Sequence, residues 1–185
     1  MPYVKTRDGI ELYFKQWGGS GAQPVILIHG YPLNADSFDR TAMKLVEAGF
    51  RAISYDRRGF GRSDQPWHGY DWDTFSDDLA DVMHATGATS DVTIIGYSMG
   101  GGEAARYMSR HGGKGVIKIG LYASIVPGML KSDDNPAGHP PSDYDDIATG
   151  IERTPQRFSV TLSCRLSTVS SPRQLLAPPT PPATT

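Results

Sequence analysis

Hydrophobic and polar residues alternate in two segments near the start of the chain, residues 3–7 and 11–17, on either side of the pair Asp8-Gly9. Strict alternation is typical of a strand with one buried face, and Asp-Gly is a favoured turn between antiparallel strands. The pattern therefore predicts an antiparallel β-hairpin on a half-buried edge.

Later segments contain nearly continuous apolar runs, at residues 25–28, 51–55, 92–96 and 115–123. Such runs are expected of strands that helices cover on both faces. Stretches with helical spacing separate them, at residues 37–48, 74–85 and 100–110, and glycines that can end helices follow at positions 49, 87 and 112. Alternating strands and helices predict an α/β fold with a doubly wound, mostly parallel sheet, whose ligands bind at the carboxyl ends of the strands.

The regular pattern ends after about residue 126. Residues 127–146 are rich in Pro, Gly and Asp, and this composition fits either a loop or an excursion over the top of the sheet. From residue 154 onwards Ser, Thr and Pro dominate and no Asp or Glu occurs, so little apolar surface is available to offset an ordering entropy of about 1–2 kcal/mol per residue. We expect a folded domain over residues 1–153 and a disordered tail over residues 154–185.

Composition and charge narrow the classes of function. The 185 residues carry a formal net charge of −2 with both signs mixed, and they show no basic stripe that nucleic acid or an anionic membrane would attract. No run approaches the roughly 20 apolar residues that span a bilayer, and no signal peptide is visible, so we expect a cytoplasmic protein. Cys164 is the single cysteine, and no zinc-type spacing of Cys or His occurs. These features indicate no metal and no cofactor.

The motif Gly96-Tyr97-Ser98-Met99-Gly100 lies between an apolar strand and a helical pattern. This is the setting of a nucleophile elbow, a sharp strand-to-helix turn that holds a serine hydroxyl clear of the backbone. Gly96 and Gly100 keep side chains from colliding in such a turn. Because the following helix directs its unpaired N–H groups towards the serine, we predict Ser98 as a nucleophile and the backbone N–H of Met99 as one oxyanion donor.

A second oxyanion donor is predicted in the loop after the strand at residues 25–28, where His29-Gly30-Tyr31-Pro32 follows. Sheets that carry a nucleophile elbow take this donor from the loop after an earlier strand. The backbone N–H of Tyr31, next to Gly30, fits that position. Loss of one such donor costs roughly 2.7–4 kcal/mol of barrier lowering in a protease, so the pair would strongly stabilise a tetrahedral intermediate.

With these motifs the chain resembles the α/β-hydrolase superfamily, specifically its cofactor-free (non-haem) haloperoxidase, or chloroperoxidase, and arylesterase branch. The resemblance covers about residues 3–153. It rests on Asp8-Gly9 with LYFKQWG (12–18), HGYPL (29–33), YDRRGFGRSDQPW (55–67), YDWDTF (70–75), GYSMGGGE (96–103), RY (106–107) and RHG (110–112).

This resemblance implies a Ser-Asp-His triad, an oxyanion hole of two backbone amides, and hydrolysis of small acyl esters through an acyl-enzyme, without a cofactor. It also implies that hydrogen peroxide can replace water in the second step, which yields a peracid that oxidises halide. The implied partners are a small ester, or a carboxylic acid together with hydrogen peroxide.

The chain departs from the resembled family at residue 154. In that family the catalytic acid follows a later strand and the histidine lies near the C-terminus, after two further strand and helix units that this sequence does not show. A truncation, a frameshift or an error in the sequence is the simplest hypothesis. His139 follows Ser98 in the required order, with Asp133, Asp134 and Asp143 nearby, and is a weak candidate base. The alternative function is a catalytically inactive homologue, either a ligand binder or an unstable remnant.

Other polar groups have structural interpretations. We expect His29 to orient its loop, and we expect Asp56 and Asp64 to hydrogen-bond within a turn. The acids of residues 73–81 follow helical spacing and predict a solvated helix face rather than a metal site.

Two further expectations concern the glycine-rich segment at residues 18–21 and the apolar run at residues 115–123. Residues 18–21, Gly-Gly-Ser-Gly, superficially suggest a phosphate loop, but they lack the Lys-Ser or Lys-Thr that such a loop needs and predict a turn. If residues 115–123 form the last strand, they leave an apolar sheet edge that is prone to aggregation.

Overall fold

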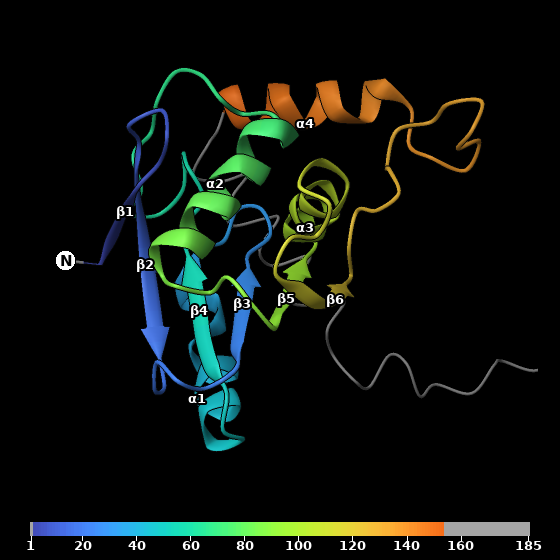
Figure 1. Ribbon diagram of the computed structural model, residues 1–185. Helices are drawn as coiled ribbons and strands as arrows, with labels where there is room; N and C mark the ends of the chain where they lie inside the picture. Colours follow the sequence, from blue (N-terminus) through green and yellow to red (C-terminus); the bar gives the residue numbers. More distant parts are fainter. Residues whose placement is uncertain (1, 154–185) are drawn as a thin grey trace, which may run out of the picture. The chain divides into compact units, whose positions relative to one another are not determined.

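Strands and helices alternate through most of the chain. The computed structural model describes residues 2–153, which fall in two compact units, Met1–Met129 and Leu130–Thr185. The first unit contains a six-stranded sheet of order β1-β2-β4-β3-β5-β6 (Figure 1). The strands are β1 (Tyr3–Lys5), β2 (Glu11–Trp17), β3 (Pro24–Ile28), β4 (Arg51–Tyr55), β5 (Val92–Tyr97) and β6 (Val116–Tyr122). The predicted tail, residues 154–185, lies outside the described residues.

The sheet is mostly parallel, as the sequence predicted. β1 and β2 form the antiparallel hairpin, and β2 pairs antiparallel with β4. The pairs β3–β4, β3–β5 and β5–β6 are parallel. The carboxyl ends of these four strands therefore meet at one edge of the sheet, where the loops after β3 and β5 carry the predicted site residues.

Helices cover both faces of the sheet. In Figure 1, α2 (Trp72–Ala85) and α3 (Met99–Arg110) lie on one face and α1 (Asp39–Glu47) on the other. Ile26 of β3 shares a buried cluster with Leu79 of α2, whereas its neighbour Leu27 shares a second cluster with Ala42 of α1. Successive side chains of one strand thus supply two cores, which is why this strand reads as a continuous apolar run. Among the described helices, none has the length and apolar character needed to cross a bilayer.

The three predicted glycines lie directly after the ends of helices. Gly49, Gly87 and Gly112 have φ angles of 87°, 69° and 62°, in the left-handed region that glycine adopts without a steric penalty. The predicted helix at residues 37–48 is in fact two elements, because a short 3₁₀ helix, η1 (Ala35–Phe38), precedes α1.

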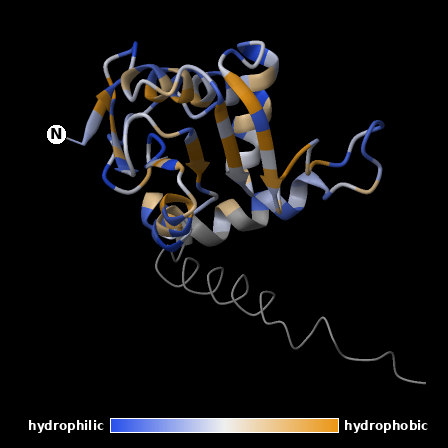
Figure 2. Ribbon diagram, turned by 60° about the horizontal axis from the view of Figure 1, so that its bottom comes forward, coloured by the Kyte–Doolittle hydropathy of each residue, from blue (hydrophilic) through white to orange (hydrophobic). Residues whose placement is uncertain are grey.

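β6 is the edge strand of the described sheet and has a hydrogen-bonded neighbour on one side only. Its apolar run suggested cover on both faces, and this is wrong: Ile117, Ile119 and Leu121 are exposed. Figure 2 shows hydrophobic residues along the central strands and also on this edge strand. The expectation of an apolar edge at residues 115–123 is confirmed.

The second unit contains a helix that the sequence analysis did not predict. α4 (Pro141–Arg153) begins inside the irregular stretch at residues 127–146. Proline is tolerated at the first helical position, and Asp143 in the first turn complements the helix dipole. The Pro, Gly and Asp content of the preceding residues hid this helix start.

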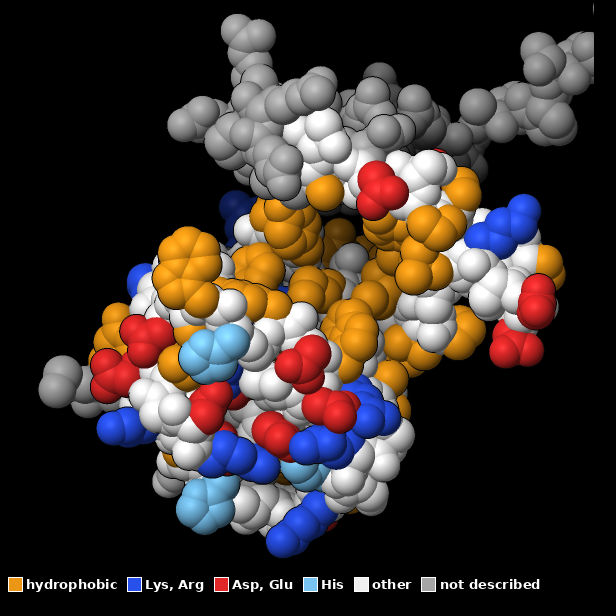
Figure 3. Space-filling model, turned by 90° about the horizontal axis from the view of Figure 1, so that it is seen from above, with side chains coloured by type: hydrophobic (Ala, Val, Ile, Leu, Met, Phe, Trp, Pro, Cys, Tyr) orange, Lys and Arg blue, Asp and Glu red, His pale blue; other side chains and the backbone are white. Residues whose placement is uncertain are grey.

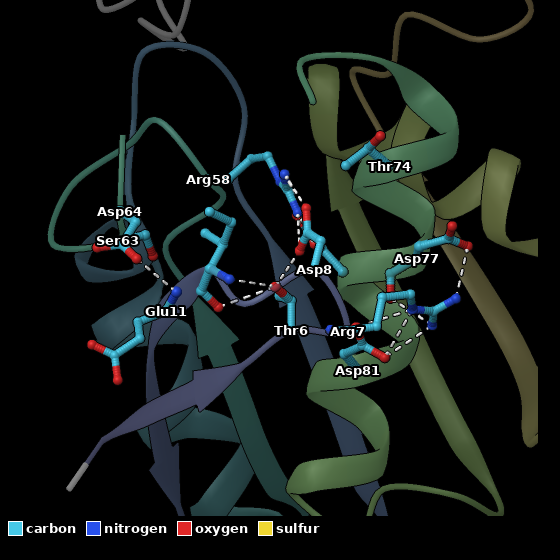
Figure 4. A network of polar contacts seen from close by, with 12 residues as sticks. Thr6, Arg7, Asp8, Glu11, Arg58, Ser63, Asp64, Thr74, Asp77 and Asp81 are labelled. Carbon is cyan, nitrogen blue, oxygen red and sulfur yellow. Dashed lines mark hydrogen bonds and ion pairs between the residues drawn. The ribbon is translucent and has the colours of Figure 1, made fainter. Parts of the chain in front are cut away.

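Ion pairs fasten the β1–β2 hairpin to α2 (Figure 4). Arg58 donates to both carboxylate oxygens of Asp78, at 2.6 and 2.7 Å, and to those of Asp8, at 2.9 and 3.1 Å. These hydrogen bonds lower the pKa of Asp8 to about 2. Arg7 pairs with Asp81 at 2.9 Å. The prediction of a solvated acidic face is therefore wrong for Asp78, which is buried because a buried arginine neutralises it.

Candidate active site

Ser98 occupies the sharp turn between β5 and α3. Its φ and ψ angles are 50° and −115°, a left-handed conformation that costs a residue with a side chain about 1–3 kcal/mol. Backbone hydrogen bonds hold the turn: the Ser98 N–H donates to the Tyr122 carbonyl at 3.0 Å, and the Ser98 carbonyl accepts from the Gly101 N–H at 3.0 Å. The Ser98 side chain is half-buried and makes no capping hydrogen bond to α3, so the hydroxyl remains available.

Gly96 and Gly100 are required for close packing around this turn. A β-carbon on Gly96 would overlap the backbone of Gly100. A β-carbon on Gly100 would overlap the carbonyl of Ile28 and lie 2.9 Å from the carbonyl oxygen of His29. The first turn of α3 therefore packs backbone to backbone against the end of β3.

The loop after β3 also contacts the turn. A β-carbon on Gly30 would lie 2.9 Å from the Ser98 β-carbon and 3.0 Å from Cδ1 of Tyr97, so the missing side chain brings this loop against Ser98. In the described part of the chain, neither the Tyr31 N–H nor the Met99 N–H donates a hydrogen bond. Met99 opens α3, where the first N–H groups have no intrahelical acceptor. Both predicted oxyanion donors are thus free in the two elements that meet at Ser98.

Arg57, which the sequence analysis did not single out, connects the elements that carry these two amides. The fully buried guanidinium donates from Nη2 to the His29 carbonyl at 2.9 Å and from Nε to Oε2 of Glu103 at 2.6 Å. Its Nη1 lies 3.6 Å from Sδ of Met99. Arg57 therefore links the loop after β3 to the beginning of α3.

Glu103 is the buried counter-charge of Arg57. It lies on the inner face of α3, and its carboxylate also accepts a hydrogen bond from the hydroxyl of Tyr55 at the end of β4. Burial, reinforced by the charge of Glu103, raises the pKa of Tyr55 well above its usual range, so this phenol stays a donor. Removal of one partner from a buried ion pair leaves an uncompensated charge and typically costs about 3–5 kcal/mol.

His29 orients the loop after β3, as expected. Its Nε2 accepts the backbone N–H of Arg57 at 3.1 Å, and its Nδ1 lies 2.9 Å from the Gly30 carbonyl oxygen. This arrangement requires the neutral tautomer with the proton on Nδ1. Burial, with a contribution from the Arg57 charge, lowers the pKa of His29 to about 4. Both ring nitrogens are occupied, so this histidine is not available to take a proton from Ser98.

Asp56 accepts a hydrogen bond within its own turn, as expected, whereas the carboxylate of Asp64 accepts one from β2 instead. Asp56 is buried and accepts from the backbone N–H of Ala35 at 2.7 Å and from that of Arg62 at 2.8 Å. Asp64 accepts from the backbone N–H of Glu11 at 2.8 Å. The two carboxylates do not form a hydrogen bond with each other, as a catalytic acid–base pair of carboxyl groups would.

His139, the weak candidate base, belongs to the second unit. Its ring is exposed, and the ring nitrogen Nδ1 lies 3.3 Å from Oδ2 of Asp143. A histidine oriented by a carboxylate is the kind of base that activates a serine. Among the described residues of the first unit, no imidazole hydrogen-bonds to the Ser98 hydroxyl, and the role of His139 stays a prediction.

Acidic side chains on α2 pair with arginines. Asp73 pairs with Arg106 at 2.5 Å, and Asp77 pairs with Arg110 at 2.8 Å. Among the side chains that the structure describes, no three or more of His, Cys, Asp or Glu gather in an arrangement that could hold a metal ion.

Apolar side chains are exposed at the edge of the sheet that carries Ser98. Tyr31 lies in the loop after β3, Trp72 opens α2, and Tyr122 ends β6, and all three are exposed. Figure 3, which looks down on this edge, shows hydrophobic side chains gathered there. Exposed aromatic side chains of the first unit therefore lie at the edge of the sheet where Ser98 is found.

Comparison with known proteins identifies the family. The family described as alpha/beta hydrolase fold matches residues 23–167, which include the loop after β3, the turn at Ser98 and α3. The chain belongs to the α/β-hydrolase family.

Several relatives of this chain are named as haloperoxidases or esterases. The chain is 46% identical over 151 residues to the non-heme chloroperoxidase CPO-A1 of Kitasatospora aureofaciens, covering 82% of this chain and 54% of the relative. It is 37% identical to the bifunctional esterase/perhydrolase DCH of Acinetobacter calcoaceticus, covering 85% and 57%. The bromoperoxidase of Bacillus anthracis superposes with a TM-score of 0.78 at 39% identity, covering 84% and 56%. The chain thus spans little more than half the length of these relatives.

Sequence reasoning missed the Arg57–Glu103 pair, although a signal for it exists. Gly100, Glu103, Ala104 and Tyr107 are buried and recur with helical spacing on α3. A glutamate within such a stripe must be paired, and a buried cation should have been sought among the arginines after β4.

Proposed function

We propose that this α/β-hydrolase is a serine hydrolase and perhydrolase that acts on small acyl esters through an acyl-Ser98 intermediate. The observation that carries the proposal is the left-handed turn at Ser98, which brings this residue against Gly30 of the loop after β3 while the amides of Tyr31 and Met99 are free. Names such as chloroperoxidase and esterase/perhydrolase among the relatives support it.

Acylation of Ser98 is the first proposed step. The Ser98 oxygen attacks the ester carbonyl carbon, and the carbonyl electron pair moves to oxygen, where the Tyr31 and Met99 amides stabilise the negative charge. The hydroxyl proton passes to a base and then to the leaving alcohol as the tetrahedral intermediate collapses. An acyl group remains on Ser98.

Deacylation decides between the two proposed activities. Water attacks the acyl-enzyme to give a carboxylic acid, whereas hydrogen peroxide attacks it to give a peracid; in both cases Ser98 recovers its proton. The peracid transfers one oxygen to a halide ion and becomes the carboxylic acid. A carboxylic acid can acylate Ser98 in place of an ester, with water instead of an alcohol as the leaving group. The proposed substrates are a small ester, or a carboxylic acid with hydrogen peroxide.

The first test uses a fluorophosphonate probe and p-nitrophenyl acetate, with Ser98→Ala as the control. We expect labelling and nitrophenol release from the full chain, and neither from the variant. With hydrogen peroxide and bromide added, we expect bromination of phenol red that also requires Ser98. Nitrophenol release that persists in Ser98→Ala would contradict the proposal.

A second function, a catalytically inactive homologue, is favoured by one observation: in the first unit, no described imidazole forms a hydrogen bond with the Ser98 hydroxyl. A sample that unfolds cooperatively but is not labelled would establish this alternative. If the chain is labelled, His139→Gln tests whether His139 is the base, because removal of the base from a Ser-His pair lowers the rate by several orders of magnitude.

A further inference from the structure

A polar pocket lies at the opposite end of the sheet from Ser98. It has a volume of about 430 Å³ and is lined by the loop before β3, the first residue of β4, the segment before β5 and the beginning of β6. Its polar lining includes Ser20, Arg51, Ser90 and Asp91. These residues lie at the amino ends of the parallel strands, so the pocket is separate from the proposed active site.

Arg51 differs from the other two buried arginines after β3. Arg57 pairs with Glu103 at 2.6 Å and Arg58 pairs with Asp78 at 2.6 Å, so both have a buried carboxylate. Arg51 is only 5% exposed, yet no described carboxylate lies within 4.0 Å of its guanidinium nitrogens. Buried charges are normally paired because removal from water is costly. Arg51 therefore lacks the anion that its burial calls for.

The hydrogen bonds of Arg51 are incomplete as well. Nη1 donates to the carbonyl of Thr86 at the end of α2, at 2.9 Å, and Arg51 is one of the residues that line the pocket. The buried Nε has no hydrogen-bond partner among the described residues. A guanidinium carries five N–H donors in a planar fork that fits carboxylate and phosphate oxygens.

We propose that this pocket binds a small oxyanion, a phosphate or a carboxylate, through Arg51. The hydroxyls of Ser20 and Ser90 on the pocket wall supply further donors. Asp91 lies on the same wall and repels an anion, so it limits the affinity. The proposal does not depend on the chemistry of Ser98.

The test is titration of the ¹⁵N-labelled full chain with inorganic phosphate and, separately, with acetate, each against sodium chloride at equal ionic strength. We expect a saturable shift of the Arg51 Nε–H signal and of the Ser90 and Asp91 amide signals. A response to phosphate alone or to acetate alone identifies the anion. No saturable shift with either anion would overturn the proposal.

Variants separate a specific site from general attraction to positive charge. Arg51→Gln should weaken binding at least about tenfold, whereas Arg40→Gln, which removes an exposed charge on α1, should leave it unchanged. Because Arg51→Gln also disturbs a buried position, Asp91→Asn provides a second test: it removes the repulsive carboxylate and should tighten binding several-fold. Equal affinity in Asp91→Asn and the unaltered chain would contradict the assignment.

Discussion

Gly30 has no side chain, and this allows the loop after β3 to lie close to Ser98. The position of a β-carbon there, 2.9 Å from the Ser98 β-carbon, is closer than real side chains approach each other. The loop would have to move away, and the Tyr31 amide would move with it. The absence of a side chain at Gly30 is therefore needed to keep the Tyr31 amide, one donor of the proposed oxyanion hole, in place.

We predict that Gly30→Ala slows fluorophosphonate labelling of Ser98 about a hundredfold, because loss of one oxyanion donor has an effect of this order. Gly19→Ala is the matched control, since a β-carbon there meets nothing within 4 Å. Labelling of Gly30→Ala at the rate of the unaltered chain would show that this loop does not position a donor.

The buried carboxylate of Glu103 compensates the charge of Arg57. We predict that Glu103→Gln lowers the free energy of unfolding by about 3–5 kcal/mol, because Arg57 is left buried without a counter-charge. Glu47→Gln breaks the exposed pair with Lys44 and should cost less than about 1 kcal/mol. Urea denaturation of both variants measures the difference, and equal costs would mean that the buried pair contributes little.

At the scale of elements, local patterns predicted most strands and helices because each depends on neighbouring residues. The apolar run at residues 51–55 coincides with β4, and Gly49 and Gly87 end the helices before β4 and β5. The links between elements were not predictable in this way. Arg57 and Glu103 are 46 positions apart, and only the folded sheet brings them together. The exposure of β6 likewise depends on strand order, which its composition does not reveal.

The exposed edge strand β6 is expected to promote aggregation. An exposed apolar edge strand offers unpaired backbone groups to another chain. We expect Ile119→Lys to reduce light scattering of concentrated samples, because a charge on an edge strand opposes strand pairing. Met43→Lys makes the same change at an exposed position on α1 and should have a smaller effect. Equal effects would indicate that net charge, rather than the sheet edge, governs aggregation.

At the scale of the whole molecule, the burial of His29 makes stability depend on pH. The pKa of His29 is about 4 in the folded chain against about 6.5 when unfolded, so the unfolded chain binds more protons between these values. Its contribution to stability is complete above pH 6.5 and is lost as the pH falls towards 4.

We therefore predict that His29 lowers the free energy of unfolding by on the order of 3 kcal/mol between pH 7 and pH 4. Urea denaturation across this range measures the slope, and His29→Gln should flatten it. His84→Gln, which replaces an exposed histidine on α2, should leave the slope unchanged. The same slope in His29→Gln would mean that other groups cause the acid sensitivity.

The hydrogen bond from the Ser98 N–H to the Tyr122 carbonyl has a mechanical consequence. Tyr122 is the last residue of the edge strand, and the Ser98 carbonyl also accepts the N–H of Ile125, just beyond that strand, at 3.3 Å. Edge strands fray more readily than central ones because fewer neighbours hold them. Fraying of β6 would release the restraint on the strained Ser98 backbone, so the alignment of the nucleophile depends on how firmly the outermost strand is held.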